Sequence, residues 1–284
     1  MKRRAFLQNA SSALGIAALT PAALKSLLSP EVAAFKIGFQ TWVVREPLNE
    51  DFVGTLKMMR KQGYETLEMC SPIGYQKYGF GPLAEYKPAE LKKIMHEEGF
   101  TCESSHFTWD ELKSDISRSI GFAGDIGLDQ MVVSSTRVGE EGTIEDWKKA
   151  CEQMNKWGMA SKKEGFPFAF HNHNIEFEKR EGQLIYDVLL ENLDPDLVQM
   201  QFQVWVVSIG YQAADYFRSH PGRFISAHLA DWTGNENERA NIGEGKVDWP
   251  DFFKAAKKGG LKNIYVEMAP EYLDGSAQYL KTIL

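Results

Sequence analysis

The clearest strand in the sequence is Pro167-Phe168-Ala169-Phe170-His171, which is followed directly by Asn172-His173. A compact apolar run bounded by turn-forming or polar residues predicts a buried parallel strand, because such strands are covered on both faces. Similar short runs recur from Phe35 onward, each followed by a polar turn and a helical stretch. The expected strands are Lys36–Thr41, Thr66–Cys70, Thr101–His106, Gln130–Ser134, Pro167–His171, Val198–Gln203, Phe224–Leu229 and Asn263–Met268.

Amphipathic patterns fill the gaps between these strands, and apolar residues in the longest recur every three to four positions along one face. Pro88 stands in the expected first turn of one helix, and glycines follow several expected helix ends. The expected helices include Asp51–Gln62, Pro88–Glu98, Asp110–Ile126 and Ile144–Lys163.

Eight strands that alternate with helices over about 250 residues predict a closed (β/α)8 barrel. A doubly wound open sheet is the alternative, and such a sheet usually carries a glycine-rich phosphate turn after its first strand. Gly38-Phe39-Gln40-Thr41-Trp42 is not a turn of that kind, and no low-complexity segment or linker divides residues 35–284. We therefore expect one α/β domain, a single TIM barrel that spans residues 35–284.

The composition is that of an ordinary globular protein, with 43% apolar and 25% charged residues among 284. The formal net charge of −7 leaves no basic surface for a phosphate backbone, which argues against nucleic acid as a partner. Cys70, Cys102 and Cys151 form no CxxC pair and are odd in number, which argues against a disulfide framework and against a thiolate metal site.

Residues 1–34 have the form of an export signal. Lys2, Arg3 and Arg4 precede an apolar run of small residues from Ala10 to Ala23, which is too short to span a bilayer stably. Paired arginines followed by Phe6-Leu7 resemble a twin-arginine signal. We therefore expect a periplasmic or secreted protein without stable membrane insertion, cleaved after position 22 or 34. The alternative is an ordinary amphipathic N-terminal helix.

Polar side chains recur near the C-terminal ends of the expected strands. In a barrel these ends meet at one mouth, where the active sites of this architecture lie. A single histidine at a strand end is typically structural. Burying six histidine, glutamate or glutamine side chains without partners, however, would cost several kcal/mol for each side chain. We therefore expect a functional cluster. Its members are Glu68, His106, His171, Gln203, His228 and Glu267, with His173 two residues beyond His171.

Histidine, glutamate and amide oxygen without thiolates favour a divalent ion such as Mn, Co, Zn, Mg or Fe. Strand periodicity places His171 and His173 on the same face, with Asn172 opposite. Either both histidines bind the metal, or His171 binds it while His173 contacts substrate.

The chain resembles the sugar phosphate isomerase/epimerase superfamily, the xylose isomerase-like barrels, from about Phe35 to the C-terminus. The order and spacing of several motifs carry the resemblance. They are Thr66-Leu67-Glu68-Met69, Ser104-Ser105-His106, His171-Asn172-His173-Asn174-Ile175-Glu176-Phe177, the run from Gly222 to Asp231 around His228, Gly243-Glu244-Gly245, and Val266-Glu267-Met268.

The resemblance implies a divalent metal ion, Mn, Co, Zn or Mg, held by Glu, Asp, His and Glu from strands five to eight. His228 and Glu267 match the last two positions. His171 stands in place of the first glutamate and Gln203 in place of the aspartate, and both can still ligate. The predicted ligands are therefore His171, Gln203, His228 and Glu267. The alternative is a polar sugar-binding cleft that has lost the metal.

The resemblance also implies proton transfer through an enediolate, for which epimerising members use two glutamates on opposite faces of the substrate. Because His171 replaces one of them, a one-sided reaction is expected, in which a base removes a proton beside a metal-bound carbonyl. Reprotonation elsewhere is isomerisation, and loss of a β-oxygen substituent is elimination. The candidate bases are Glu267, Glu68, His106 and His173.

Further residues near the strand ends receive supporting roles. Glu176 and Asp231 are expected to orient ligating histidines. Trp42, Trp109, Trp205 and Trp232 fall near strand ends. Because aromatic faces suit sugar rings, we expect Trp42, Trp109 and Trp232 to contact the substrate. Gly243-Glu244-Gly245 is acidic where a phosphate cradle would present bare amides and lysine, which favours an unphosphorylated sugar or keto-sugar as the small-molecule partner.

The leading hypothesis is a metal-dependent sugar isomerase or epimerase. A lyase or hydratase that eliminates across a 3-keto-glycoside is the second, favoured by export and by the broken glutamate pair. A non-catalytic sugar-binding barrel is the third, and it requires that metal be absent. The acidic charge argues against a DNA-repair enzyme similar to endonuclease IV.

Overall fold

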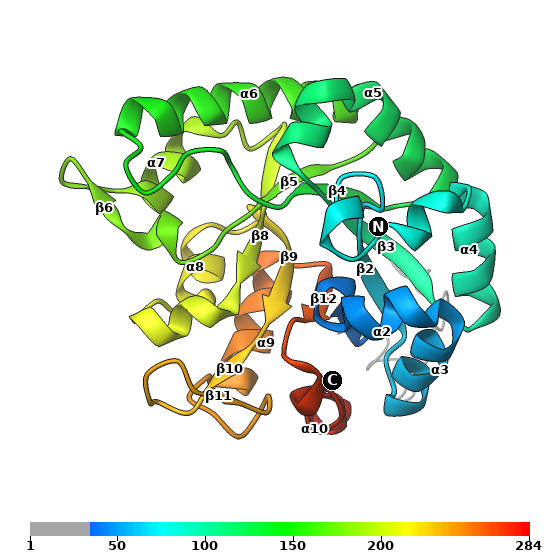
Figure 1. Cartoon of the computed structure of the whole chain (residues 1–284). Helices are drawn as coiled ribbons and strands as arrows, with labels where there is room; N and C mark the ends of the chain where they lie inside the picture. Colours follow the sequence, from blue (N-terminus) through cyan, green and yellow to red (C-terminus); the bar gives the residue numbers. More distant parts are fainter. Residues whose placement is uncertain (1–34) are drawn as a thin grey trace, which may run out of the picture. The chain divides into compact units, whose positions relative to one another are not determined.

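Eight parallel strands form the centre of the computed structural model, which describes residues 35–284 (Figure 1). These strands are β1 (Gly38–Gln40), β2 (Thr66–Cys70), β3 (Thr101–Phe107), β4 (Gln130–Val133), β5 (Phe168–His171), β8 (Val198–Gln203), β9 (Phe224–Leu229) and β12 (Asn263–Val266).

The strands close into a barrel in the order β1-β12-β9-β8-β5-β4-β3-β2. Each pairs in parallel with the next barrel strand along the chain, and β12 completes the ring by pairing with β1, Phe39 opposite Val266. The predicted (β/α)8 barrel is confirmed, and a doubly wound sheet is excluded because the sheet closes on itself. The predicted export signal lies outside the described residues.

Helices follow the strands and surround the barrel in Figure 1. Residues 144–163 form the expected long helix, whose N-terminus carries a capping box between Thr143 and Asp146. Among the described residues, no helix has the length and apolar character needed to cross a membrane. The helices are α2 (Arg45–Glu50), α3 (Phe52–Gln62), α4 (Pro88–Glu97), α5 (Trp109–Ile126), α6 (Ile144–Lys163), α7 (Ile185–Asn192), α8 (Ala213–Ser219), α9 (Trp249–Gly259) and α10 (Pro270–Ile283).

Short elements decorate the barrel ends. Two small antiparallel hairpins and several 3-10 helices follow the strands. The hairpins are β6 (Lys179–Arg180) with β7 (Gln183–Leu184), and β10 (Asp231–Trp232) with β11 (Arg239–Ala240). The 3-10 helices are η1 (Thr41–Val44), η2 (Gln76–Tyr78), η3 (Pro82–Glu85), η4 (Ile175–Phe177) and η5 (Val204–Ile209).

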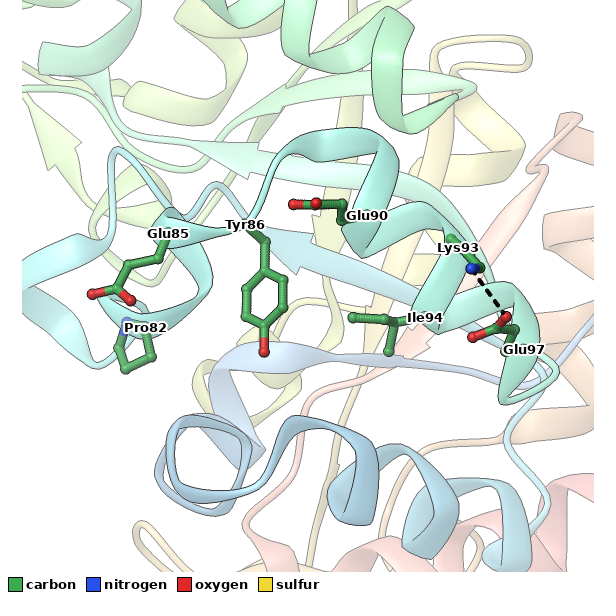
Figure 2. A pocket seen from close by; sticks show the side chains of 7 residues that line it. All are labelled: Pro82, Glu85, Tyr86, Glu90, Lys93, Ile94 and Glu97. Carbon is green, nitrogen blue, oxygen red and sulfur yellow. Dashed lines mark ion pairs between the residues drawn. The ribbon is translucent and has the colours of Figure 1, made fainter.

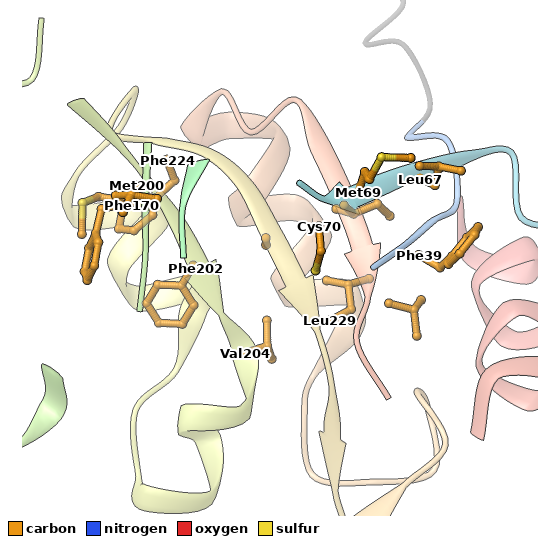
Figure 3. Close-up of a cluster of buried hydrophobic side chains, with 14 of the residues drawn as sticks. Phe39, Leu67, Met69, Cys70, Phe170, Met200, Phe202, Val204, Phe224 and Leu229 are labelled. Carbon is orange, nitrogen blue, oxygen red and sulfur yellow. The ribbon is translucent and has the colours of Figure 1, made fainter. Parts of the chain in front are cut away.

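The barrel wall separates an apolar exterior layer from a polar interior. Buried apolar side chains from the strands, among them Leu67, Met69 and Phe202, form the core with the helices (Figure 3). Strand alternation turns the residue between Leu67 and Met69, Glu68, to the inside of the barrel. The site is therefore built from the inward residues of strands whose outward residues hold the helices.

Helix α6 approaches the start of β8 so closely that only glycine fits at position 158. An added Cβ there would lie 2.3 Å from the backbone oxygen of Leu197. We expect Gly158→Ala to lower the free energy of unfolding by about 1–3 kcal/mol, because overpacking outweighs the helix propensity gained. The matched control is Gly121→Ala on exposed α5, where an added Cβ meets nothing within 4 Å. Chemical denaturation should show the control equal to or more stable than the parent, and equal behaviour of both variants would contradict the packing.

Candidate functional site

His228 lies between two carboxylates at the centre of the barrel. Its Nε2 contacts Glu68 Oε2, and its Nδ1 lies 3.1 Å from Glu267 Oε2. The side chain is fully buried. Burial alone would lower the pKa of His228, but the two carboxylates outweigh it and raise the pKa to about 10. Without a bound metal ion, His228 is therefore an imidazolium with both ring N–H groups paired.

Glu68 is fully buried and its oxygens are saturated with hydrogen bonds. It accepts from Gln40 Nε2 at 2.7 Å, Ser104 Oγ at 2.5 Å and Gln201 Nε2 at 2.7 Å. Burial would raise its pKa, but His106, His228 and these hydrogen bonds lower it to about 2. The predicted base Glu68 thus lies below the barrel mouth as an anchor for His228.

Three buried histidines gather above Glu68. Ligand nitrogens of His106, His171 and His228 lie within 4.8 Å of one another. The ring centroid of His228 is 4.4 Å from that of His171 and 5.0 Å from that of His106. Burial lowers the pKa of His106 and of His171, which keeps both rings neutral at pH 7. His171 Nδ1 is buried and has no hydrogen-bond partner among the described residues.

This donor set fits a divalent metal ion. Neutral imidazoles are ligands that Zn, Co and Fe accept readily, and His171 Nδ1 is buried without another partner. His228 joins such a set only by releasing its imidazolium proton and exchanging one of its two carboxylate contacts for the metal. This set shares His171 and His228 with the ligands predicted from the sequence and adds His106, whereas the predicted ligands Gln203 and Glu267 are hydrogen-bonded to each other.

The side-chain amide of Gln203 explains the difference. Its oxygen accepts the backbone N–H of Trp205 at 3.1 Å, and its nitrogen donates to Glu267 Oε2. Because a backbone N–H can only donate, the orientation of the amide is determined. Gln203 therefore presents N–H groups toward Glu267, where the predicted ligand set requires an oxygen.

A cavity of about 600 Å³ opens above these groups at the C-terminal mouth. Four residues predicted for the site line it, namely Trp42, His173, Gln203 and Glu267. His106 and Glu68 do not, because they lie beneath it. The other lining residues are Val43, Arg45, Asn174, Trp205, Arg239, Met268, Ala269 and Pro270. A second cavity of about 640 Å³ lies on the outer surface along η3 and α4 and contains none of the predicted residues (Figure 2).

His173 and Glu267 are the groups at this cavity that can exchange protons. The His173 side chain is exposed at the mouth, and desolvation by the surrounding atoms lowers the pKa of its ring, which is therefore neutral at pH 7. Within residues 35–284, neither nitrogen of the ring makes a hydrogen bond. Burial would raise the pKa of Glu267, but the charge and hydrogen bond of His228 outweigh burial and bring the pKa below its ordinary value. The carboxylate is therefore ionised. The cavity thus holds one free imidazole base and one hydrogen-bonded carboxylate.

Glu176 and Asp231 support backbone and not histidine rings, contrary to expectation. Glu176 Oε2 accepts the backbone N–H of His173 at 2.6 Å and so fixes the position of that residue. Asp231 accepts four backbone N–H groups and the indole N–H of Trp249 at 2.8 Å. Its other donors are Trp232, Gly243, Gly245 and Val247, so it organises the loop after β10 and β11.

The predicted tryptophans divide into one at the cavity and two elsewhere. Trp109 packs on Trp157, with ring centroids 4.6 Å apart, and borders a separate surface cavity beside α6. Trp232 donates its indole N–H to Asn235 O within the hairpin loop. Trp42 does line the cavity, together with Trp205.

An internal repeat marks Gln40, a site residue that the sequence predictions missed. Phe-Gln-Thr-Trp-Val-Val at 39–44 recurs as Phe-Gln-Val-Trp-Val-Val at 202–207. In each copy the glutamine oxygen accepts the N–H of the tryptophan two residues later, at 3.0 Å for Gln40 and 3.1 Å for Gln203. Each glutamine nitrogen then donates to one of the glutamates that hold His228, Glu68 or Glu267.

The fold and the position of these histidines and glutamates define the class of the protein, a TIM barrel with its candidate active site at the C-terminal end of the strands. The chain is a member of the xylose isomerase-like TIM barrel family, whose model matches residues 56–283. None of the curated proteins compared with the chain matches it.

Solved structures are similar over most of the chain. A sugar phosphate isomerase/epimerase from Parabacteroides distasonis is 26% identical, with a TM-score of 0.71 over 88% of this chain and 95% of its own. The IolI protein with a zinc atom is 15% identical, with a TM-score of 0.66 over 88% and 96%. The probable 3-DHS dehydratase AsbF from Bacillus anthracis is 10% identical, with a TM-score of 0.68 over 87% and 99%. The last two show a shared fold alone.

Glu176 supplies a pH-dependent prediction. Burial raises its pKa to about 8, so the native state holds a proton that the unfolded state releases from its ordinary value of 4.5 upward. The native state therefore loses stability as pH rises from 4.5 to 8. Glu176→Gln keeps the acceptor for His173 N but does not titrate, so we expect its relative stability to grow by about 1 kcal/mol per pH unit in that range. Urea unfolding at pH 5 and pH 8 measures this, with Glu178→Gln on exposed chain as the control. A pH-independent difference between Glu176→Gln and the parent would refute the buried protonated acid.

Proposed function

We propose that this protein removes a proton from the carbon beside a carbonyl in an unphosphorylated sugar or keto-sugar, with the help of a divalent metal ion, as a sugar isomerase or epimerase. The observation that carries the proposal is the neutral ring of His173 beside ionised Glu267 in one cavity, next to three clustered histidines. Similarity to the Parabacteroides sugar phosphate isomerase/epimerase supports the reaction class. Export to the periplasm or beyond is part of the proposal and would account for a free sugar as substrate.

The metal would be held by His106, His171 and His228. A divalent ion supplies Lewis-acid stabilisation of the negative charge that develops on a carbonyl oxygen during deprotonation. Two of these three histidines are next to residues that line the cavity. The His171 ring is 4.9 Å from the His173 ring, and His228 Nδ1 lies beside Glu267.

His173 is the better base of the two cavity groups. General bases act best when their pKa lies near the working pH. His228 lowers the pKa of Glu267 below that of an ordinary carboxyl, which makes the carboxylate a weak base, whereas His173 has an unshared lone pair. Glu176 positions the His173 backbone, and Glu267 is left to hold a substrate hydroxyl or to return a proton.

Elimination across a 3-keto-glycoside is the second candidate. The observation that favours it is that Glu267 is engaged by His228 and Gln203, which leaves His173 as the base with an unshared lone pair. Epimerisation would use a base on each face of the substrate, while elimination needs one. The same proton removal serves both reactions. They diverge when the electron pair either recovers a proton at carbon or expels a β-oxygen substituent.

Two variants locate the metal. We expect His106→Gln to reduce bound Zn, Co or Mn below stoichiometric levels, and Gln203→Ala to retain it, because only His106 belongs to the histidine cluster. Metal content is measured by mass spectrometry after soaking and dialysis, with circular dichroism to verify folding. Loss of metal in Gln203→Ala with retention in His106→Gln would instead place the ion on Gln203 and Glu267.

Isotope exchange tests the reaction. The protein is incubated in D2O with ketoses and 3-keto-glycosides and followed by NMR. Deuterium beside the carbonyl with the carbon skeleton retained indicates isomerisation or epimerisation, and release of the aglycone indicates elimination. We expect His173→Gln to slow exchange about 10²–10⁴-fold while leaving metal content unchanged. Absence of both exchange and aglycone release in the metal-loaded parent would contradict proton abstraction from these substrates.

A further inference from the structure

Two arginines line the cavity in addition to the groups of the proposed mechanism. Arg45 stands at the start of α2, and Arg239 is on β11. The Arg45 guanidinium carbon lies 4.4 Å from the ring centroid of Trp42, and that of Arg239 lies 4.2 Å from the centroid of Trp205. The protein as a whole is acidic, so two cations at one cavity are a local departure from its charge.

Neither guanidinium is neutralised by a buried carboxylate. Within residues 35–284, Arg239 has no ion pair, and its hydrogen-bond contact is Nη1 to the weak acceptor Met268 Sδ at 3.7 Å. Arg45 donates to Trp42 O at 2.9 Å, and the carboxylate paired with it, at 3.8 Å, belongs to the exposed side chain of Glu46. Both arginines therefore keep most of their donors free. By contrast, exposed Arg218 is paired with Asp215 and Asp251.

Stacking on tryptophan directs these free donors. A guanidinium held over an indole face is stabilised by the ring quadrupole, and its N–H groups point outward in the plane of the fork. A fork with free in-plane donors matches the two oxygens of a carboxylate or a phosphate. The stacked arginine also covers one face of each tryptophan, so those faces do not serve the sugar stacking that was expected of Trp42.

The fold builds this Trp–Arg unit twice. Both tryptophans come from the repeated Phe-Gln-x-Trp-Val-Val motif, and both glutamines fix the tryptophan backbone while gripping a glutamate of the His228 cluster. In the barrel order β1-β12-β9-β8, the two motifs begin at the ends of β1 and β8. They therefore flank β12, which Glu267 directly follows, and β9, which carries His228. The two units thus stand on either side of the reactive groups.

The remaining charges at the cavity do not satisfy the arginines. Glu267 is ionised, but its Oε2 already accepts from His228 and from Gln203. Burial lowers the pKa of Arg239, and Glu267 offsets this from beyond ion-pair distance. Helix α10 also begins at the cavity with Pro270, and no side chain caps its first turn. An anion that entered the cavity would meet guanidinium groups that no buried carboxylate neutralises.

We propose that the substrate carries an oxyanion, and that Arg239, assisted by Arg45, binds it. The proposal rests on the proposed function for the reaction itself and names the class of substrate. Within that function, the oxyanion is the carboxylate of a sugar acid, so the enzyme acts on an acidic keto-sugar or uronate. Phosphate shares the same recognition chemistry, and the test distinguishes the two.

Titration calorimetry on the full chain compares D-glucuronate with D-glucose, and D-glucose 6-phosphate with both. We expect glucuronate to bind at least about tenfold more tightly than glucose, as a charge-assisted bidentate contact requires. Arg239→Gln should abolish this preference and leave glucose binding unchanged. Arg45→Gln should reduce it by a smaller factor. The matched control is Arg218→Gln on the surface, which should leave all affinities unchanged.

Uronate binding no tighter than that of glucose, or a uronate preference that survives Arg239→Gln, overturns the proposal. A preference for glucose 6-phosphate over glucuronate that Arg239→Gln abolishes contradicts the sugar acid and assigns the same arginines to phosphate. These binding measurements are independent of turnover. A failure of the proposed reaction appears in the D2O experiment, and a failure of the oxyanion site appears here.

Discussion

An imidazole held by two carboxylates inside the barrel is the interaction on which the rest of the site depends. His228 joins Glu68, below, to Glu267, at the mouth. Glu68 is fully buried and the Glu267 side chain is 20% exposed, so removal of the histidine would leave both carboxylates without their cationic partner in a poorly solvated site, which is strongly unfavourable. The pairing explains why both glutamates can be ionised in a buried setting. It also links the interior of the barrel to the cavity, since the same ring contacts both.

The polar side chains inside the barrel replace apolar packing, and hydrogen bonds among them offset the loss. The inward positions of TIM barrels are typically filled by branched apolar side chains. Here Gln130 donates to both Ser104 and Ser226, and Gln201 donates to Glu68 and Ser226. A network in which nearly every member is paired has few alternative arrangements, which fixes the ring positions above it. Precision at the mouth therefore originates from the strands.

The strand pattern of the sequence was sufficient for the barrel and for the end of it that carries the site, because alternation and strand direction are local properties. The depth of each side chain in the barrel and the orientation of its polar atoms could not be predicted from the strand pattern. Glu68 and His106 have the same strand periodicity as the residues that line the cavity, yet they lie beneath it. The orientation of the Gln203 amide depends on one hydrogen bond, in which its oxygen accepts the backbone N–H of Trp205. Trp109 packs on a neighbouring helix that periodicity cannot identify as its partner. The repeated Phe-Gln-x-Trp-Val-Val motif was the available signal for the second glutamine, Gln40.

The two positions at which the chain departs from the carboxylates implied by its family resemblance act in one direction. A histidine at 171 and a glutamine at 203 remove two negative charges from the mouth, and Gln203 contributes N–H donors where an aspartate would accept. Because carboxylates at the mouth would repel a nearby anion strongly in a poorly solvated site, an acidic mouth would disfavour an anionic ligand. Once those charges are absent, the guanidinium groups of Arg45 and Arg239 line the cavity with no buried carboxylate to neutralise them. The substitutions and the two Trp–Arg units are thus consistent parts of one electrostatic arrangement, in which Glu267, the carboxylate that lines the cavity among the described residues, is paired with the His228 imidazolium.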